Sequence, residues 1–254
     1  MNSLIFHRNS QKIFLFLFLF LFSIQFIFWI NTNNVRPEVG ILPPLPNKAT
    51  VQATSLGDTQ FYFRLLSLRL QNAGDSFGRF TSLKKYDYNK LYSWLHFLSD
   101  LDFHSNVFPS LASYYYTSTA IADDARIMVQ YLDEHSSRDI DKKWWWMFQA
   151  SNIARYIVKD NQLALDLAYK LQKTNAKGAP YWVKQLPALL HARMGESCQS
   201  FLIINKILQD IENKTYVASQ EEMDFMRHFI DYRLKILRKE EFNPKSCPIA
   251  FKPR

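Results

Sequence analysis

The longest apolar stretch of the chain runs from Ile13 to Ile30, and it constrains the fold more than any other feature. It contains no charged residue, and only Ser23 and Gln25 are polar. At about 1.5 Å per helical residue it spans about 27 Å, close to the ~30 Å hydrocarbon core of a bilayer. A single strand in lipid leaves its backbone groups without partners, so we expect a helix that crosses a membrane.

The charges on the two sides of this stretch predict its orientation. Arg8 and Lys12 precede it without an acid, whereas Arg36 and Glu38 offset each other after it. Lys and Arg close to a span stay on the cytoplasmic side. We therefore expect residues 1–12 to form a short cytoplasmic N-terminus and residues 13–30 to anchor the chain. The larger C-terminal part is then expected in the periplasm of a bacterium.

A cleaved secretory signal is the alternative interpretation of the same stretch. The apolar region of such signals has about 7–15 residues and is followed by a site with small residues. Here the run is longer, and its last residues, 26–30, are all bulky. We therefore favour an uncleaved signal anchor in a single-pass inner-membrane protein.

Composition narrows the class of the remaining residues. The formal net charge is +8, from 31 Lys and Arg against 23 Asp and Glu. The basic residues are dispersed, whereas nucleic-acid-binding proteins usually concentrate them in a dense stripe. The excess fits a solvated surface, an acidic partner or a negatively charged membrane. Six Gly and ten Pro are few for a chain rich in β-turns, which favours an all-α fold.

The chain beyond the anchor divides into three parts. Residues 31–54 are rich in proline and predict an extended linker. Residues 55–240 predict a helical domain, and residues 241–254 form a C-terminal tail. At the start of the domain Phe61, Leu65, Leu68 and Leu70 are expected to form the apolar stripe of the first helix.

A repeat of 36 residues runs through the helical part. It aligns Asp124, Asp160 and Glu196 at the starts of successive helices. The apolar positions that follow also align, as Met128 with Ala164 and Ser200, Tyr131 with Leu167 and Ile203, and Leu132 with Ala168 and Ile204. A period of about 34–40 residues with paired helices is typical of helical-hairpin solenoids.

Residues 160–168, DNQLALDLA, resemble the second helix of a tetratricopeptide (TPR) repeat. Gly195-Glu196 resembles the turn between repeat helices, and Pro180 resembles the proline that opens a following unit. The similarity covers about residues 109–211. With the anchor, the chain resembles single-span bacterial inner-membrane proteins that carry a periplasmic TPR-like domain. This resemblance implies an adaptor in an envelope assembly.

Two runs of three aromatics, at residues 114–116 and 144–146, are the candidate binding residues. Neighbouring side chains on a helix point about 100° apart, so one Tyr and one Trp are expected outside the core. Exposed aromatics commonly anchor protein interfaces. The alternative is packing between repeats. The residues expected to contact a protein partner are Tyr115, Lys142, Lys143, Trp144 and Trp145.

Catalytic motifs are not found in the sequence. There is no GxSxG, glycine-rich phosphate loop, HExxH or CxxC pattern, so we expect no enzyme activity, cofactor or metal. Asp100, Asp102 and His104 form the one acid-and-imidazole cluster, and a helix-connecting turn is their simpler role. Cys198 and Cys247 are either a disulfide pair or a buried and a free cysteine.

The function expected from these features is a membrane-tethered adaptor or scaffold that binds a protein partner in the cell envelope. A structural subunit of a larger membrane complex is the alternative. An envelope enzyme with a site built from scattered Asp and His residues is the third reading.

Overall fold

The computed structural model describes the backbone of residues 2–32, 40–76, 79–176, 178–180, 182–213 and 217–239. Side chains are described for the same residues except 2–12, 32, 48, 76, 79 and 233–239. The predicted C-terminal tail, 241–254, lies outside these ranges. The chain divides into two compact units, Met1–Pro43 and Pro44–Arg254.

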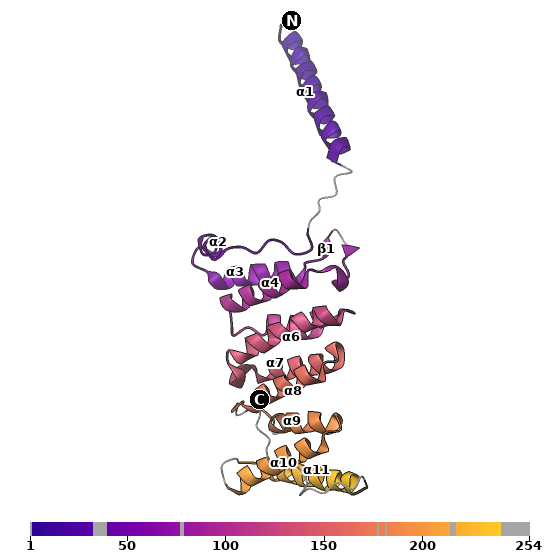
Figure 1. The fold of residues 1–254 in the computed structure, drawn as a ribbon. Coiled ribbons are helices and arrows are strands. Elements are labelled where there is room, and N and C mark those ends of the chain that lie inside the picture. Colours follow the sequence, from indigo (N-terminus) through magenta and orange to yellow (C-terminus); the bar gives the residue numbers. More distant parts are fainter. Residues whose placement is uncertain are drawn as a thin grey trace. The chain divides into compact units, whose positions relative to one another are not determined.

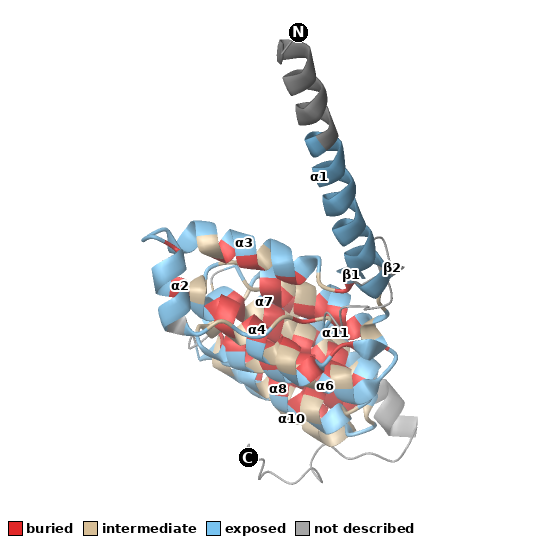
Figure 2. Cartoon of the chain, turned by 90° about the horizontal axis from the view of Figure 1, so that it is seen from above, coloured by how far each residue is buried: buried red, intermediate tan, exposed pale blue. Residues whose placement is uncertain are grey.

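The first unit contains one long helix, α1 (Asn2–Thr32). Its segment Ile13–Asn31 has the length and the apolar composition needed to cross a membrane, and none of it is buried. Figure 2 shows its described residues as exposed along the whole helix. The helix begins well before the apolar run, because residues 2–12 continue the helical backbone.

The second unit is almost entirely helical (Figure 1). One antiparallel pair of two-residue strands, β1 (Asp75–Ser76) and β2 (Arg79–Phe80), aligns Asp75 with Phe80. The α-helices are α2 (Lys48–Thr54), α3 (Thr59–Gln71), α4 (Tyr88–Leu101), α5 (Val107–Ser110), α6 (Ala122–Ser137), α7 (Ile140–Ile153), α8 (Asn161–Gln172), α9 (Trp182–Arg193), α10 (Ser197–Glu212) and α11 (Gln220–Lys239). Short 3-10 turns occur at η1 (Leu83–Lys85) and η3 (Tyr116–Ser118), and π-helical turns at η2 (Leu111–Tyr115) and η4 (Ala154–Val158).

The helices of this unit stack in chain order. From α6 to α11 each helix packs against the next one in sequence, and α4 packs against α6. Figure 1 shows the helices as successive layers, and Figure 2 shows the buried residues between them. Fully buried side chains include Trp94 of α4, Met128 and Tyr131 of α6, and Met147 of α7. A further cluster of buried residues, Ala188, Ile204, Ile207 and Met226, joins α9, α10 and α11.

The 36-residue repeat has a structural counterpart. Asp160 and Glu196 are the N-cap residues of α8 and α10, and Asp124 lies in the first turn of α6. The aligned positions Met128, Ala164 and Ser200 are fully buried, as are Leu132, Ala168 and Ile204. Equivalent residues of the repeat therefore occupy equivalent core positions on alternate helices.

Two predictions at the start of the domain are wrong. Residues 48–54, assigned to the linker, form α2, because Asn47 caps it through the Thr50 amide and Val51 is buried. In α3 the predicted stripe is largely exposed, at Phe61, Leu65 and Leu68. Leu70, the fourth residue of the predicted stripe, is buried, together with Phe63 and Leu66, which the stripe did not include. Apolar residues occupy two faces of α3, and packing of Phe63 on Phe108, 5.5 Å between ring centres, selects one of them.

Candidate functional site

Aromatic side chains from η2, α7 and α9 form a row at the surface. Trp145 of α7 donates a hydrogen bond from Nε1 to the Tyr114 hydroxyl of η2, over 3.0 Å. The Trp145 and Phe148 rings are 5.5 Å apart, and Phe148 lies 4.6 Å from Trp182 of α9. We call this set the aromatic surface; it comprises Tyr114, Trp144, Trp145, Phe148 and Trp182. The predicted residue Tyr115 is exposed, but its ring contact is with Tyr116, at 5.1 Å, and the described contacts do not join it to this row.

Helical geometry explains which rings of the two runs face solvent. In α7 Trp146 is buried, and its Nε1 donates to Asn106 Oδ1 over 3.1 Å. Trp145, one position earlier, is 38 % exposed, and Trp144 packs 6.2 Å from Trp182. In the other run Tyr116 is buried, whereas Tyr115 is 48 % exposed. The expectation that one Tyr and one Trp lie outside the core is therefore confirmed.

Two of the helical segments that carry exposed tyrosines contain a π-helical turn. In η2 the widened turn contains Tyr114 and Tyr115, and in η4 it contains Tyr156. Lys159 follows η4 in the left-handed conformation, with φ 62°, and this ends the segment. A π-turn shifts the positions of the side chains around the helix axis, and such turns are frequent at functional sites.

The helices beneath the aromatic surface carry more basic than acidic residues, and the one acid of α7 is Asp141 in its first turn. No Asp or Glu occurs in residues 107–118, 142–158 or 182–193. Arg155 and Lys159 near η4 and Arg193 of α9 contribute positive charge, and none of the three forms an ion pair with a described residue. The aromatic surface therefore lies in a region of uncompensated positive charge.

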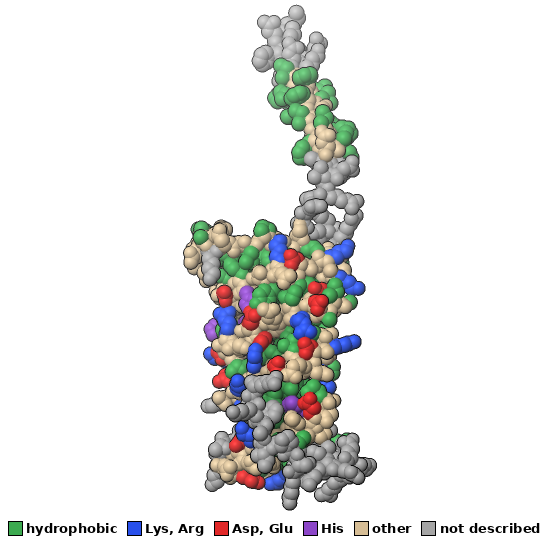
Figure 3. Space-filling model, viewed as in Figure 1, with side chains coloured by type: hydrophobic (Ala, Val, Ile, Leu, Met, Phe, Trp, Pro, Cys, Tyr) green, Lys and Arg blue, Asp and Glu red, His purple; other side chains and the backbone are tan. Residues whose placement is uncertain are grey.

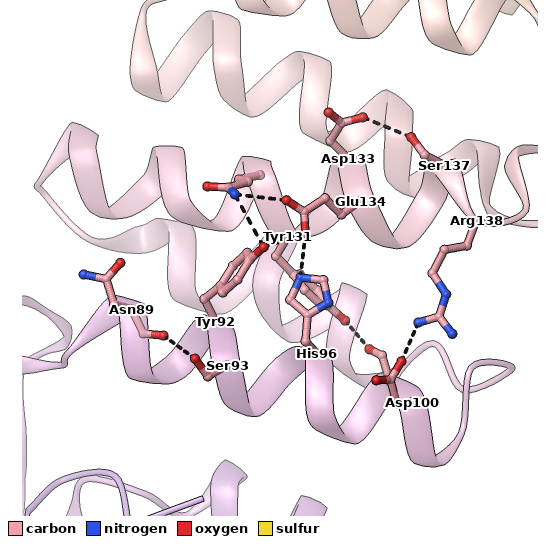
Figure 4. Close-up of polar contacts among 12 residues, drawn as sticks. Asn89, Tyr92, Ser93, His96, Asp100, Tyr131, Asp133, Glu134, Ser137 and Arg138 are labelled. Carbon is pink, nitrogen blue, oxygen red and sulfur yellow. Dashed lines mark hydrogen bonds and ion pairs between the residues drawn. The ribbon is translucent and has the colours of Figure 1, made fainter.

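A second set of helices, α4, α6 and α8, behaves differently. Its charges pair with one another, as Arg138 with Asp100 over 2.9 Å, Lys170 with Asp133 over 2.6 Å and Arg126 with Asp160 over 2.8 Å. Figure 4 shows the α4–α6 part of this ion-paired surface, and Figure 3 shows acidic and basic side chains interspersed on the visible face of the unit. These charges satisfy one another between repeats.

His96 and Glu134 lie at the centre of the α4–α6 contacts, with 3.0 Å between His96 Nε2 and the carboxylate. Burial lowers the pKa of His96, more than the neighbouring Glu134 raises it. Burial alone raises the pKa of Glu134, but hydrogen bonds from Tyr92 and Gln130 outweigh it and lower the pKa. This network stabilises the contact between the two helices, and no cavity adjoins it among the two described pockets.

Lys143 does not belong to the surface on which the sequence placed it. It is 4 % exposed, and its ammonium donates to the His104 carbonyl over 3.2 Å and to Asn106 Oδ1 over 3.1 Å. Burial lowers its pKa. Position 143 follows the same helical rotation that buries Trp146, so its side chain turns inward and fixes the loop before α5. Lys142, in contrast, is exposed and pairs with Asp139 over 3.1 Å.

The acid-and-imidazole cluster is a turn. Asp102 Oδ1 accepts hydrogen bonds from the backbone amides of His104 and Ser105, while Asp100 pairs with Arg138. In the part of the chain whose side chains are described, no group of three or more His, Cys, Asp or Glu residues has the arrangement of a metal site. Within the described chain, Cys198 is disulfide-bonded; Cys247 lies outside the described residues, so their pairing stays a prediction.

Three further histidines, His135, His191 and His228, occupy different environments. His191 is buried between the Tyr169 hydroxyl, at 2.8 Å from Nε2, and the Glu196 carboxylate at Nδ1. It links α8, α9 and the start of α10. His228 is exposed on α11, and neither ring nitrogen of the buried His135 has a hydrogen-bond partner among the described residues.

Several residues of the site were not singled out from the sequence. They are Tyr114, Phe148, Arg155, Tyr156, Trp182 and Arg193. The repeat carried a signal for Trp182, because the 36-residue offset aligns it with Trp146. Phe148 lies one helical turn after the tryptophans, and this spacing places it on their side of α7.

Comparison with known proteins gave no relative from which to infer a function. The chain matches no family model, and no curated protein and no solved structure is significantly similar to it. What the structure defines is therefore a class: a helical chain with one apolar N-terminal helix and a sequential stack of helices that carries an aromatic surface.

Proposed function

We propose that the chain is a membrane-tethered binding protein that holds a partner protein on its aromatic surface. The observation that carries this proposal is that exposed aromatic rings lie close to arginines that form no ion pair with a described residue. Large aromatic side chains bury much area at low entropic cost, and they are frequent anchors of interfaces. Unpaired arginines next to them favour a partner with acidic residues.

The helical stack supports the choice of a binding role. Its packing in chain order, with equivalent residues buried every 36 positions, is compatible with a TPR-like solenoid. Solenoids of this type present extended surfaces to partner segments. We assign the stack to this architecture as part of the proposal, and we take the tether to be α1 in a bacterial inner membrane, with the helical unit in the periplasm.

The proposal is tested by photocrosslinking in native membranes. Benzoylphenylalanine in place of Trp145 is expected to capture a defined protein, which mass spectrometry identifies. The matched control places the same residue at Tyr232, an exposed tyrosine of α11. Trp145→Ala combined with Tyr114→Ala is expected to reduce recovery of that partner at least tenfold, as loss of two interface anchors predicts. Equal capture at both positions, or full recovery with the double variant, would refute the proposal.

A structural subunit of a larger complex is the second candidate. The observation that favours it is the exposed stripe Phe61, Leu65 and Leu68 on α3, which is apolar and lies apart from the aromatic surface. Stable subunit interfaces are larger and more apolar than transient ones. Serine substitutions at these three positions would then dissociate the complex in native gels, whereas changes at Trp145 would not.

A further inference from the structure

A groove adjoins the aromatic surface between α7, η4 and α9. It has a volume of about 290 Å³. Its apolar wall includes Phe148, Trp182, Leu186 and Leu189, and two arginines, Arg155 and Arg193, also line it. This volume lies at the lower end of the range for ligand pockets, about 300–1,000 Å³, and suits one or two side chains of a partner segment.

The two arginines converge on a single tyrosine. Arg193 Nη1 donates to the Tyr156 hydroxyl over 2.7 Å, and the Arg155 guanidinium carbon lies 5.0 Å from the centre of the Tyr156 ring. Neither guanidinium forms an ion pair with a described residue. Each guanidinium has five N–H donors in a fixed fork. Among the described residues the two arginines donate one side-chain hydrogen bond, from Arg193 to the Tyr156 hydroxyl.

None of the described residues that line the groove is acidic, so no lining residue neutralises the two arginines. The segments 142–158 and 182–193 contain no Asp or Glu. On the ion-paired surface of α4, α6 and α8, in contrast, Arg126, Arg138 and Lys170 each lie within 3 Å of a carboxylate oxygen. The groove therefore combines an apolar wall with two arginines that form no ion pair with a described residue.

We infer that this groove binds a partner segment in which a carboxylate follows or precedes a bulky apolar side chain. The apolar side chain packs against Trp182 and Leu186, and the carboxylate accepts hydrogen bonds from Arg155 and Arg193. Arginine is well suited to this role because its planar fork matches the two oxygens of a carboxylate. The inference rests on the proposed binding function and names the chemistry of the segment that is bound.

The experiment uses the full chain in lipid nanodiscs and a random library of 12-residue peptides displayed with a free carboxy terminus. Selected peptides are expected to place Asp, Glu or the terminal carboxylate within about three residues of Phe, Leu or Trp. Synthetic copies are expected to bind Arg155→Gln/Arg193→Gln at least about tenfold more weakly, which corresponds to about 1.4 kcal/mol. Lys206→Gln, at an exposed cation of α10 outside the groove lining, is the matched control and is expected to bind normally.

Two further comparisons identify the source of the carboxylate. A loss of affinity on amidation of the peptide terminus assigns it to the chain end, and a loss on replacement of Asp or Glu by the amide assigns it to a side chain. Either result supports the inference. If neither change has an effect, or if selected peptides are neutral or basic, the inference is overturned.

The failure of this inference is distinguishable from that of the proposed function. Peptides that lose binding with Trp145→Ala but bind Arg155→Gln/Arg193→Gln normally refute the groove and leave the aromatic surface as a binding site. Selection of no specific peptide at all refutes both. Circular dichroism and thermal unfolding of each variant establish that the helical unit is folded before binding is compared.

Discussion

At the scale of single residues, burial changes the acid–base behaviour of His135. His135 is 1 % exposed, and its ring contacts Phe103 and Tyr131, with centre distances of 5.0 and 5.7 Å. Desolvation, with the nearby charges of Lys143 and Arg138, lowers its pKa to about 3. The folded chain therefore holds this imidazole neutral at a pH where the unfolded chain protonates it.

This difference predicts a loss of stability in mild acid. Between about pH 6.5 and pH 3 the unfolded state binds a proton at position 135 and the folded state does not. Above about pH 6.5 the contribution of His135 to the free energy of unfolding is constant. As the pH falls from about 6.5 to about 3, the free energy of unfolding decreases by up to about 1.4 kcal/mol per pH unit. His135→Leu removes the titration, so denaturant unfolding of the variant is expected to depend less steeply on pH. Parallel curves for the two proteins would contradict the prediction.

The two neighbouring lysines of α7 offer a matched pair for a stability measurement. Lys143→Met removes the donor to the His104 carbonyl and one of the two donors to Asn106 Oδ1, which keeps its hydrogen bond from Trp146 Nε1. We expect a loss of about 1–3 kcal/mol in the free energy of unfolding. Lys142→Met, at a residue whose ion pair with Asp139 is solvent-exposed, is expected to change stability little. Equal effects of the two substitutions would show that the burial of Lys143 is not energetically important.

At the scale of elements, the repeat depends on how its helices begin. Asp160 caps α8 by accepting from the Leu163 amide over 2.9 Å, and it also pairs with Arg126 of α6. One residue thus starts a helix and joins it to the helix of the preceding repeat. Its capping bond to the Leu163 amide, together with the Arg126 guanidinium, keeps the pKa of the Asp160 carboxyl below its usual value.

Asp160→Ala is therefore expected to lower the free energy of unfolding by about 1–2 kcal/mol, as the loss of an N-cap predicts. Asp166→Ala, on the same helix, serves as the control because its side chain bonds only to Gln162, over 2.9 Å. Thermal or urea unfolding of the two variants gives the comparison. A control variant as unstable as Asp160→Ala would refute a specific role for the cap.

The elements also show the limits of patterns read from sequence. Capping and apolar spacing placed the start of α8 correctly, because Asp160 both aligns with the repeat and caps the helix. Apolar spacing failed for α3, whose apolar residues are distributed over two faces. No local pattern distinguishes two such faces, since the choice depends on which one meets α4 and Phe108.

At the scale of the whole molecule, the anchor sets the expected compartment. A reporter that is active only outside the cytoplasm, fused after Arg254, is expected to be active. The positive charges before the apolar run should retain the N-terminus inside. Arg8→Glu with Lys12→Glu is expected to reduce reporter activity by weakening this orientation, while Arg36→Glu with Glu38→Arg should leave it unchanged. An inactive reporter on the unchanged chain would contradict the predicted topology.

If the helical unit lies in an oxidising compartment, Cys198 and Cys247 are able to form a disulfide bond. If Cys198 pairs with Cys247, a loop of roughly 50 residues is closed, and the chain-entropy model assigns it about 4 kcal/mol of stabilisation. Cys198→Ser and Cys247→Ser are then expected to lower the melting temperature equally. Alkylation without reduction should modify neither cysteine of the unchanged chain. Unequal shifts or free thiols would exclude this pairing.

The sequence by itself determined the apolar helix, the helical class and the repeat register, because these depend on runs, caps and spacings that lie within one segment. It also required part of each aromatic run to face solvent. Only the tertiary structure decided that Lys143 turns inward, that Trp182 joins the tryptophans of α7, and that Arg155 and Arg193 meet at Tyr156. These outcomes depend on contacts between segments about 40 residues apart, and side-chain contacts at that separation are set by packing.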